Sequence, residues 1–321
     1  MAFTPLERRR FGRTTLDVTS LCVGTAPLGD MPEAFGFSVP ADRALATLRA
    51  AFASPIRFVD TSANYGNGNA EQLIGTVLAE IGGLPADRVV ATKADRDMTT
   101  GDFSGDQMKR SVEESLERLG LERLQFVYIH DPEHTTFEHV MARGGALDVL
   151  QGLQRQGVLG DLGISGGPID MLIRYVETGA FAAVETHNRY TLLNRSAQPL
   201  LDAASERGVA VVNAAPYGSG MLAKGPDANA RYAYQDAPPA LVDRARRLAA
   251  ICDAHGVPLA AAALQFSMRD PRVTSTVVGM TRPERVEQTL ALAATPIPDA
   301  LWPALDAVGF DMTDPEAGRW G

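Results

Sequence analysis

The stretch FVDTSANYGNGNAEQLIG (residues 58–75) contains the unit from which the fold can be predicted. It begins with a short apolar run that ends in Asp60, continues through a glycine-rich turn, and passes into a segment with helical spacing of its apolar residues. A strand followed in this way by a helix is the building block of a parallel sheet with crossover helices.

The rest of the chain repeats this pattern, so that eight strand-like runs each precede a helix-like segment. Eight such units in roughly 250 residues are typical of a closed barrel, and no linker or change in composition divides the chain. We therefore predict an α/β fold, a (β/α)8 TIM barrel, in one domain over residues 1–321; a doubly wound open sheet is the alternative. The predicted strands are 20–24, 57–60, 88–93, 125–130, 160–165, 182–186, 208–213 and 275–279, and the predicted helices are 41–53, 70–81, 105–119, 145–156, 168–178, 195–207, 240–255 and one that begins near Pro258.

Two segments lie outside the repeat. Residues 8–20 alternate in polarity around a turn-like GRTT, which predicts a hairpin that closes one mouth of the barrel. Residues 218–239 are rich in Gly, Ala and Pro and are too long for a plain connection, and loops of that length usually carry function.

The composition argues against several classes of protein. The formal net charge is −9 and the basic clusters are short, which argues against a nucleic-acid partner. Cys22 and Cys252 are too few for a disulfide framework and favour a reducing compartment. Residues 1–12 lack the apolar run of a signal peptide, and no stretch has the length of a membrane span. We expect a cytoplasmic protein with a small-molecule substrate and no membrane partner, and we predict no oligomeric state.

Three consecutive predicted strands end in residues that can transfer a proton. These ends are Asp60, Lys93 and His130, and Tyr65 follows Asp60 in the loop. In a barrel such strand ends share the catalytic face. Any one of these residues alone could belong to a solvated ion pair at the rim of the barrel, but together they suit acid–base chemistry. An ammonium lowers the pKa of a nearby phenol, and a carboxylate keeps the ammonium charged. We expect Tyr65 to exchange a proton with a carbonyl or hydroxyl oxygen that His130 also binds.

These residues and their surroundings resemble the aldo-keto reductase superfamily. VDTSANYGNGNAEQLIG (59–75) is similar to its D-T-x-x-x-Y-G-x-G-x-x-E motif, and MKRSVEESLERLGLERLQFVYIHDP (108–132) to the segment that leads to its histidine. RRRFGRTTLDVTSLCVGTAPLG (8–29) resembles its N-terminal hairpin and first strand. The resemblance implies a (β/α)8 barrel that transfers hydride between a nicotinamide cofactor and a carbonyl or hydroxyl carbon. The implied catalytic tetrad is Asp60, Tyr65, Lys93 and His130.

The glycines after Tyr65 then belong to a catalytic loop. They are not a dinucleotide-binding G-x-G-x-x-G turn, in which Glu71 would occupy the place of the third glycine. Asn69 and Gln72 resemble a capping box at the start of the following helix.

The resemblance also implies where the cofactor binds. STVVGMTRPERVEQT (275–289) resembles the family's adenosine-phosphate segment, and YGSGMLAK (217–224) the loop that folds over the pyrophosphate. Ser165 matches the serine that bonds the nicotinamide amide. The implied cofactor-binding residues are Ser165, Glu185, Ala214, Gly220, Leu222, Gly279, Met280, Thr281, Arg285, Gln288 and Thr289.

Four positions depart from the family pattern. Gly166 stands where many members have asparagine, and Glu185 where a glutamine often meets the nicotinamide amide. Ala214 replaces a stacking aromatic residue. Gly279 replaces a lysine that often pairs with the 2′-phosphate of NADP, although Arg282 lies nearby. The cofactor is therefore predicted to be NAD or NADP, with a preference for NAD or for dual use.

The substrate prediction rests on the same resemblance. NRYTLLNR (188–195) and residues 275–289 resemble the branch that contains L-fucose, D-threo-aldose and L-galactose dehydrogenases and pyridoxal 4-dehydrogenase. This implies oxidation of an aldose at its anomeric carbon, with a broad-specificity aldehyde or ketone reductase as the alternative. His187 is expected to bind substrate together with Tyr65 and His130. Further substrate-shaping residues are expected in 28–39, 131–143, 218–239 and 302–320.

Two other functions are compatible with the chain. A Schiff-base lyase would use Lys93 as its nucleophile, but that requires a lowered lysine pKa, which Asp60 opposes. A cofactor-binding sensor or regulatory subunit is known in the family, although a complete tetrad argues against a purely binding role. His134 and His139 do not combine with His130 into a metal site, because Pro132 interrupts their register and no carboxylate set completes it. We predict no metal.

Overall fold

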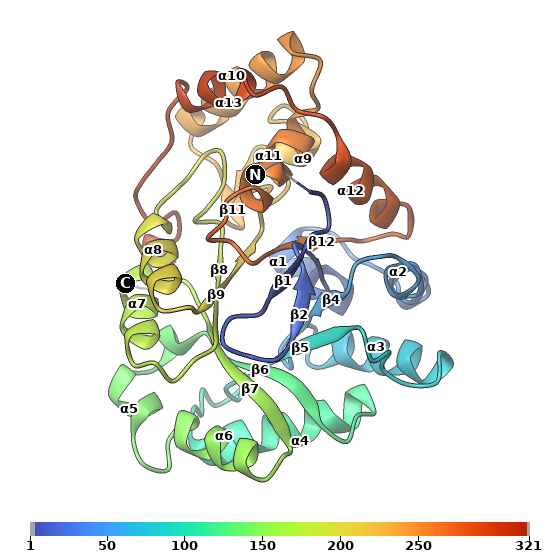
Figure 1. Ribbon diagram of the computed structural model, residues 1–321, viewed down its shortest axis with the longest axis vertical. Coiled ribbons are helices and arrows are strands. Elements are labelled where there is room, and N and C mark those ends of the chain that lie inside the picture. The colour runs from blue at the N-terminus through green and yellow to red at the C-terminus, as the bar shows by residue number, and fades with distance from the viewer. Residues whose placement is uncertain (1–3, 320–321) are drawn as a thin grey trace.

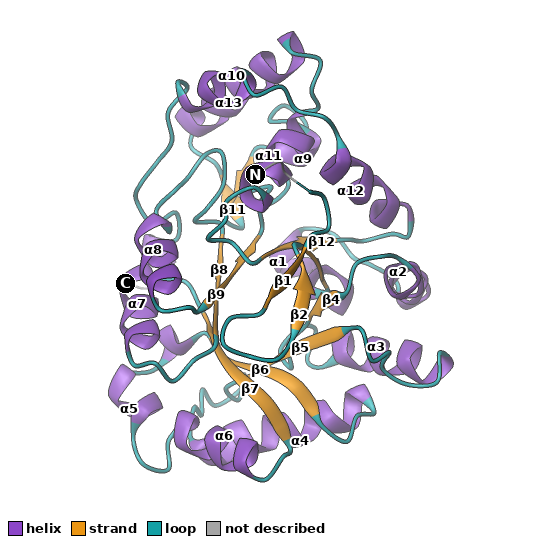
Figure 2. Cartoon of the chain, viewed as in Figure 1, coloured by secondary structure: helices purple, strands orange, loops and turns teal. Residues whose placement is uncertain are grey.

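The computed structural model describes residues 4–319 and contains a closed barrel of parallel strands (Figures 1 and 2). The strand order is β12-β3-β4-β5-β6-β7-β8-β9, so the last barrel strand pairs with the first. This confirms the predicted (β/α)8 barrel and rules out the open sheet. The barrel strands are β3 (Leu21–Gly24), β4 (Phe58–Asp60), β5 (Val89–Ala94), β6 (Leu124–His130), β7 (Leu159–Ser165), β8 (Ala183–His187), β9 (Ala210–Ala214) and β12 (Ser275–Gly279).

Helices surround the barrel (Figure 2). They bury apolar side chains against it. Side chains such as Leu48, Ile74 and Leu150 form this layer, where each buried aliphatic side chain contributes about 1.5–3 kcal/mol. The apolar spacing predicts eight of the nine main helices, all but α12, and the predicted bounds lie within three residues of the observed ones. The main helices are α2 (Ala41–Ala53), α3 (Asn69–Glu80), α4 (Gly105–Leu119), α6 (Ala146–Arg155), α7 (Ile169–Glu177), α8 (Gln198–Glu206), α10 (Pro239–Ala254), α11 (Leu259–Met268) and α12 (Glu284–Ala294).

Several short helices were not predicted, because one or two turns carry too little apolar periodicity. They are η1 (Ala26–Gly29), α1 (Pro32–Phe35), η2 (Pro132–His134), α5 (Phe137–Met141), α9 (Met221–Lys224), α13 (Leu301–Asp306) and η3 (Ala317–Arg319). The 218–239 segment contains α9 and a small hairpin, β10 (Arg231–Tyr232) and β11 (Gln235–Asp236). Tyr232 anchors this hairpin, because its buried hydroxyl donates to Asn188 O (2.6 Å).

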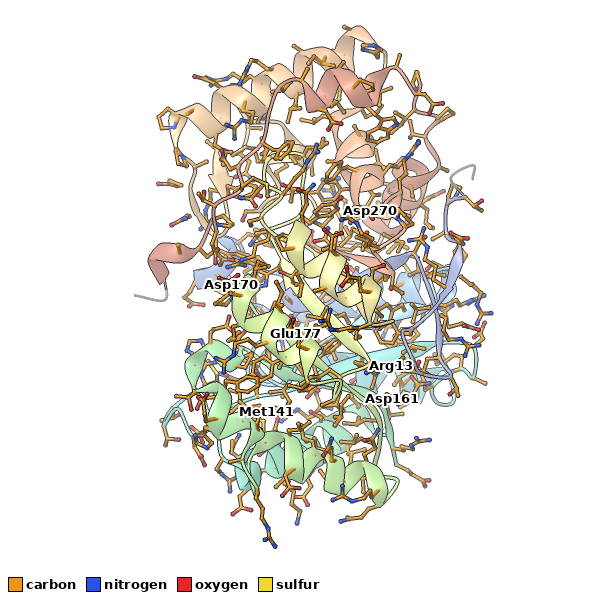
Figure 3. All side chains as sticks on the ribbon, turned by 60° about the vertical axis from the view of Figure 1, so that its left-hand side comes forward. Arg13, Met141, Asp161, Asp170, Glu177 and Asp270 are labelled. Carbon is orange, nitrogen blue, oxygen red and sulfur yellow. The ribbon has the colours of Figure 1, made fainter. Side chains whose placement is uncertain are left out.

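The predicted N-terminal hairpin consists of β1 (Arg8–Arg10) and β2 (Asp17–Thr19), and it covers the N-terminal mouth of the barrel (Figure 1). Phe11 enters the barrel, where its ring packs edge-on against Phe58 and Phe126 at centroid distances of 5.2 and 4.7 Å. Arg13 ties the hairpin to the chain before β8 by donating to Gly179 O (2.8 Å) and Phe181 O (3.0 Å) (Figure 3).

Within residues 4–319, no single helix is both long and apolar enough to span a membrane. Helices α10 and α11 meet the criteria of length and composition only as a pair, and that pair is bent by 100°.

Replacing Phe11 tests the role of the hairpin as a plug. Because the ring is fully buried among aromatic neighbours, Phe11→Ala should lower the free energy of unfolding by about 3–5 kcal/mol. Urea unfolding followed by circular dichroism measures the change. Ile81→Ala is the control, since Ile81 is 47% exposed and its loss should cost less than about 0.5 kcal/mol. An equally small loss for Phe11→Ala would show that the plug does not stabilise the barrel.

Candidate active site

The structure brings the four predicted catalytic residues together at the C-terminal ends of β4, β5 and β6. Lys93 Nζ donates to Asp60 Oδ1 (2.6 Å), to Tyr65 Oη (3.1 Å) and to Thr61 O (3.0 Å). These three acceptors take all three hydrogens of the ammonium. The side chain of Lys93 is 0% exposed, so it exchanges no hydrogen bond with bulk solvent.

Close packing fixes the loop that carries Tyr65. Gly66 has φ +63°, and a Cβ there would lie 1.9 Å from Gly29 O. Glycine is therefore required at residue 66, where the loop after β4 touches the loop after β3. The predicted capping box was wrong: Gly68, with φ +88°, is the N-cap of α3, and Asn69 instead donates its side-chain amide to Gly29 O (3.1 Å).

Glu71 has a structural part in this motif. Its buried carboxylate accepts from the hydroxyl of Thr92 and from Arg118 Nε (2.8 Å). It therefore links α3 to β5 at the residue next to Lys93, and to α4. The glutamate that breaks the dinucleotide fingerprint holds in place the strand that carries Lys93.

His130 has two partners that sequence reasoning missed. Its Nδ1 lies 2.6 Å from Asp95 Oδ1 and 3.2 Å from Ser62 Oγ, and the Ser62 hydroxyl donates to Asp95 Oδ2 (2.6 Å). Asp95 is 3% exposed and Ser62 is fully buried. A carboxylate on Nδ1 orients the ring, and Nε2, on its other side, lies 3.4 Å from Asp131 Oδ1. The one signal in the sequence that could have identified Asp95 is its place two residues after Lys93, at the same strand end.

The charge on His130 follows from these contacts. Burial by itself would lower the pKa of the imidazole, but Asp131 and Asp95 outweigh it and raise the pKa to about 9. His130 is therefore a cation at neutral pH. It lies beside Tyr65, at a ring-centroid distance of 6.0 Å and an interplanar angle of 84°.

The pKa of Tyr65 is higher than the sequence led us to expect. Burial raises its pKa well above the ordinary value; Lys93 lowers it as predicted, while Asp60 and Glu185 raise it further. The expected low phenol pKa was therefore wrong for this state, because burial and two carboxyl groups outweigh one ammonium. Tyr65 keeps its proton at neutral pH. Since Lys93 donates to the phenol oxygen, that proton is available to a substrate oxygen.

Lys93 is firmly charged. Burial alone would lower its pKa, but Asp60 and Glu185 together raise it well above the ordinary value. A nucleophilic amine needs the opposite shift, so the geometry opposes the Schiff-base lyase.

The eleven residues predicted to bind the cofactor divide into three groups by their place in the structure. A cavity of about 870 Å³ opens beside β12 and the loop after β9. Six of the predicted residues line it: Gly220, Gly279, Thr281, Arg285, Gln288 and Thr289. Leu222 and Met280 are fully buried in the hydrophobic core and do not line it. Ser165, Glu185 and Ala214 lie at or near the ends of β7, β8 and β9, on the face that carries the tetrad.

The cavity is strongly basic. Five cationic side chains from four parts of the chain line it, and among the described residues no Asp or Glu does. In a chain of net charge −9 this concentration of positive charge suits a polyanion such as a pyrophosphate. Sequence reasoning found Arg282 and Arg285 but missed the other three. The five are Arg43, Lys224, Arg231, Arg282 and Arg285.

The tetrad does not line this cavity. Pro27 and Ala215, which do line it, lie just beyond the ends of β3 and β9, so the cavity reaches the same face of the barrel. Ala215 has φ +57° and directly follows its strand, as Asp131 (φ +46°) follows β6 and Asn188 (φ +59°) follows β8. Such left-handed residues are costly and gather at functional sites.

His187 faces the C-terminal segment. Its Nε2 lies 3.0 Å from Glu316 Oε2, and the fully buried Arg189 contacts Glu316 Oε2 (2.9 Å) and Asp314 Oδ1 (2.7 Å). These ion pairs fold the end of the chain over the β8 side of the site. Of the predicted substrate-shaping range 302–320, Trp320 lies outside the described residues. Among residues 4–319, no cluster of three or more His, Cys, Asp or Glu is arranged to hold a metal ion.

Comparison with known proteins gives consistent matches over most of the chain. The model of the Aldo/keto reductase family matches residues 20–309. Pyridoxal 4-dehydrogenase from Microbacterium luteolum is 32% identical, covering 95% of this chain and 98% of the relative. D-threo-aldose 1-dehydrogenase from Pseudomonas sp is 34% identical, covering 90% and 94%. In fold, the chain is similar to the holo form of aldo-keto reductase AKR11C1 from Bacillus halodurans, with a TM-score of 0.79, 21% identity, and coverage of 98% and 99%.

Replacing Asp95 tests the origin of the charge on His130. In Asp95→Asn the pKa of His130 should fall from about 9 to about 6–8, because one carboxylate charge is removed. Proton NMR titration of the imidazole resonances measures it, and the chain has only five histidines.

Asp95→Asn should also change how the free energy of unfolding depends on pH. The folded pKa lies above the ordinary 6.5, so the His130 contacts stabilise fully below pH 6.5 and that contribution is lost as pH rises through about 9. Asp95→Asn should remove most of this dependence. Asp97→Asn is the control, since Asp97 is bonded to its own loop. A midpoint that stays near 9 in Asp95→Asn would assign the effect to Asp131 alone.

Proposed function

This chain belongs to the aldo/keto reductase family and is an NAD(P)-dependent oxidoreductase, and we propose that it is an aldose 1-dehydrogenase. The observation that carries the proposal is the buried ammonium of Lys93, bonded to both Asp60 and Tyr65. This arrangement serves proton exchange with an oxygen, which hydride transfer at the attached carbon requires.

The residues present fit a nicotinamide dinucleotide. The cavity is large, basic and free of lining carboxylates among the described residues, and the Tyr217 hydroxyl is buried there without a hydrogen-bond partner in the described part of the chain. Thr281, Arg282, Arg285 and Gln288 would hold the adenosine phosphate end. When bound, the nicotinamide supplies a hydride acceptor or donor.

The chain's own residues then handle the proton. In the proposed oxidation, the substrate hydroxyl lies between Tyr65 Oη and His130 Nε2. The positive charge of His130 stabilises negative charge that develops on the substrate oxygen. Tyr65 takes the proton of that hydroxyl as its own proton moves to Lys93 and an ammonium proton of Lys93 moves to Asp60, and in reduction the transfers run in reverse.

The choice of substrate rests on chemistry and on relatives. One relative is a D-threo-aldose 1-dehydrogenase, similar over nearly the whole chain. A sugar offers several hydroxyl groups, and His187, with its Glu316 partner, is suited to bond them. A broad-specificity aldehyde or ketone reductase is the second candidate, favoured by the protonated state of Tyr65, which suits donation to a carbonyl. A sensor subunit would not need the tetrad.

We propose use of NAD or dual use of NAD and NADP. Gly279 offers no side-chain charge, which favours NAD, whereas Arg282 and Arg285 can pair with a 2′-phosphate. We also propose that residues 1–321 act as one domain in the cytoplasm. The pairing of β12 with β3 supports the first point and two free, buried cysteines support the second.

Cofactor reduction by the purified protein tests the function. With L-fucose, D-arabinose, L-galactose or pyridoxal, and with NAD or NADP, we expect turnover of at least one sugar. Tyr65→Phe should lower that turnover by about 100-fold or more, because the proton carrier is lost. Its affinity for NADH, measured by fluorescence titration, should stay near wild type.

Two results would contradict the proposal. Turnover of simple aldehydes without any sugar would favour the broad reductase. Loss of NADH binding in Tyr65→Phe, equal to the loss of turnover, would make Tyr65 a structural residue.

A further inference from the structure

A second carboxyl group lies against the buried ammonium of Lys93. Glu185 Oε1 on β8 is 3.5 Å from Lys93 Nζ, and the two side chains are 5% and 0% exposed. Asp60 Oδ1 on β4 contacts the same nitrogen at 2.6 Å. Two carboxyl groups therefore share one ammonium inside the barrel.

One ammonium cannot neutralise two buried carboxylates. If both were ionised, the cluster would carry a net negative charge away from water, which is costly. Asp60 Oδ2 and Glu185 Oε2 are both buried, and a buried carboxylate oxygen without a hydrogen-bond donor is costly unless its carboxyl group is protonated. No donor among the described residues reaches either of these two oxygens. The pair therefore holds one proton.

The surroundings of Glu185 set the pH at which the pair releases that proton. Burial and then Asp60 raise the pKa of Glu185 to about 8, while Lys93 and His130 lower it. The pair keeps its proton at neutral pH and releases it in mildly alkaline solution. The titratable groups that face Glu185 come from β3, β4, β5, β6 and the loop after β4: Cys22, Asp60, Tyr65, Lys93, Tyr128 and His130.

We propose that Glu185 is a positioning residue that stores, with Asp60, the proton that Tyr65 exchanges with substrate through Lys93. The role rests on the proposed hydride transfer. In oxidation the substrate O–H bond breaks and its proton goes to Tyr65 Oη. The phenol proton goes to Lys93 Nζ, and one ammonium proton goes to the carboxyl pair. A bound oxidised nicotinamide would supply the hydride acceptor, so protons and electrons balance.

This storage explains how a protonated tyrosine can act in both directions. Above the pKa of Glu185 the pair has a vacant proton site, as oxidation requires; below it, the pair holds the proton that reduction consumes. Oxidation should therefore rise and reduction fall as pH increases through about 8. In Glu185→Gln, which keeps the shape of the side chain but cannot ionise, both inflections should disappear.

Infrared titration tests the stored proton without cofactor or substrate. The carbonyl band of a neutral carboxylic acid should disappear with a midpoint near pH 8 in the wild-type protein and be absent from Glu185→Gln. Glu133→Gln is the matched control, because Glu133 is a half-buried carboxyl bonded to Gly167 N (2.8 Å) rather than to Lys93. It should retain the titrating band.

Labelling the glutamate carboxyl carbons with ¹³C gives a second measurement that needs no variant. The titrating band should shift in the labelled wild-type protein. A titrating band that persists in Glu185→Gln would overturn the stored proton, and one that labelling leaves in place would overturn its assignment to Glu185. The band can be present in a protein that oxidises no sugar, in which case the proposed function fails and the stored proton stands.

Discussion

The site depends on one interaction, the buried ammonium of Lys93 in contact with Asp60. An unpaired charge at this depth would cost several kcal/mol, so the two groups hold each other in place. Their pairing joins β5 to β4, and the third hydrogen bond of Lys93 positions the Tyr65 loop. The closed barrel makes this possible, because parallel strands deliver their ends to one face. The same burial that strengthens these contacts also keeps Tyr65 protonated.

At the C-terminal face of the barrel, acidic and basic side chains occupy different places. Acidic groups gather around the barrel axis, where Asp60 and Glu185 surround Lys93, whereas the neighbouring cavity is lined by cations. His130 lies between two carboxylates, Asp95 and Asp131, and becomes a cation. In the proposed reaction each region has its own role. The basic cavity would bind an anionic cofactor, and the acidic centre would accept and release a proton.

Much of this could be predicted from the sequence, because the relevant residues are local to a strand and the turn after it. The barrel follows from eight strand–helix units, and the tetrad from residues that end successive strands. What could not be predicted depends on contacts between distant segments. Asp95 meets His130 only through the register of β5 and β6, and Arg43 and Arg231 come to line one cavity only when the chain is folded. The capping box failed because Gly68 can adopt a left-handed N-cap that leaves Asn69 free for Gly29.

The most direct test of the central interaction is single-turnover hydride transfer in Lys93→Met, with cofactor already bound and circular dichroism to establish folding. Methionine fills a similar volume without the ammonium. We expect hydride transfer to slow by at least about 100-fold while NADH still binds, because the proton route behind Tyr65 is removed. A rate within about tenfold of wild type would show that the buried ammonium is a structural support and that the proton travels by another route.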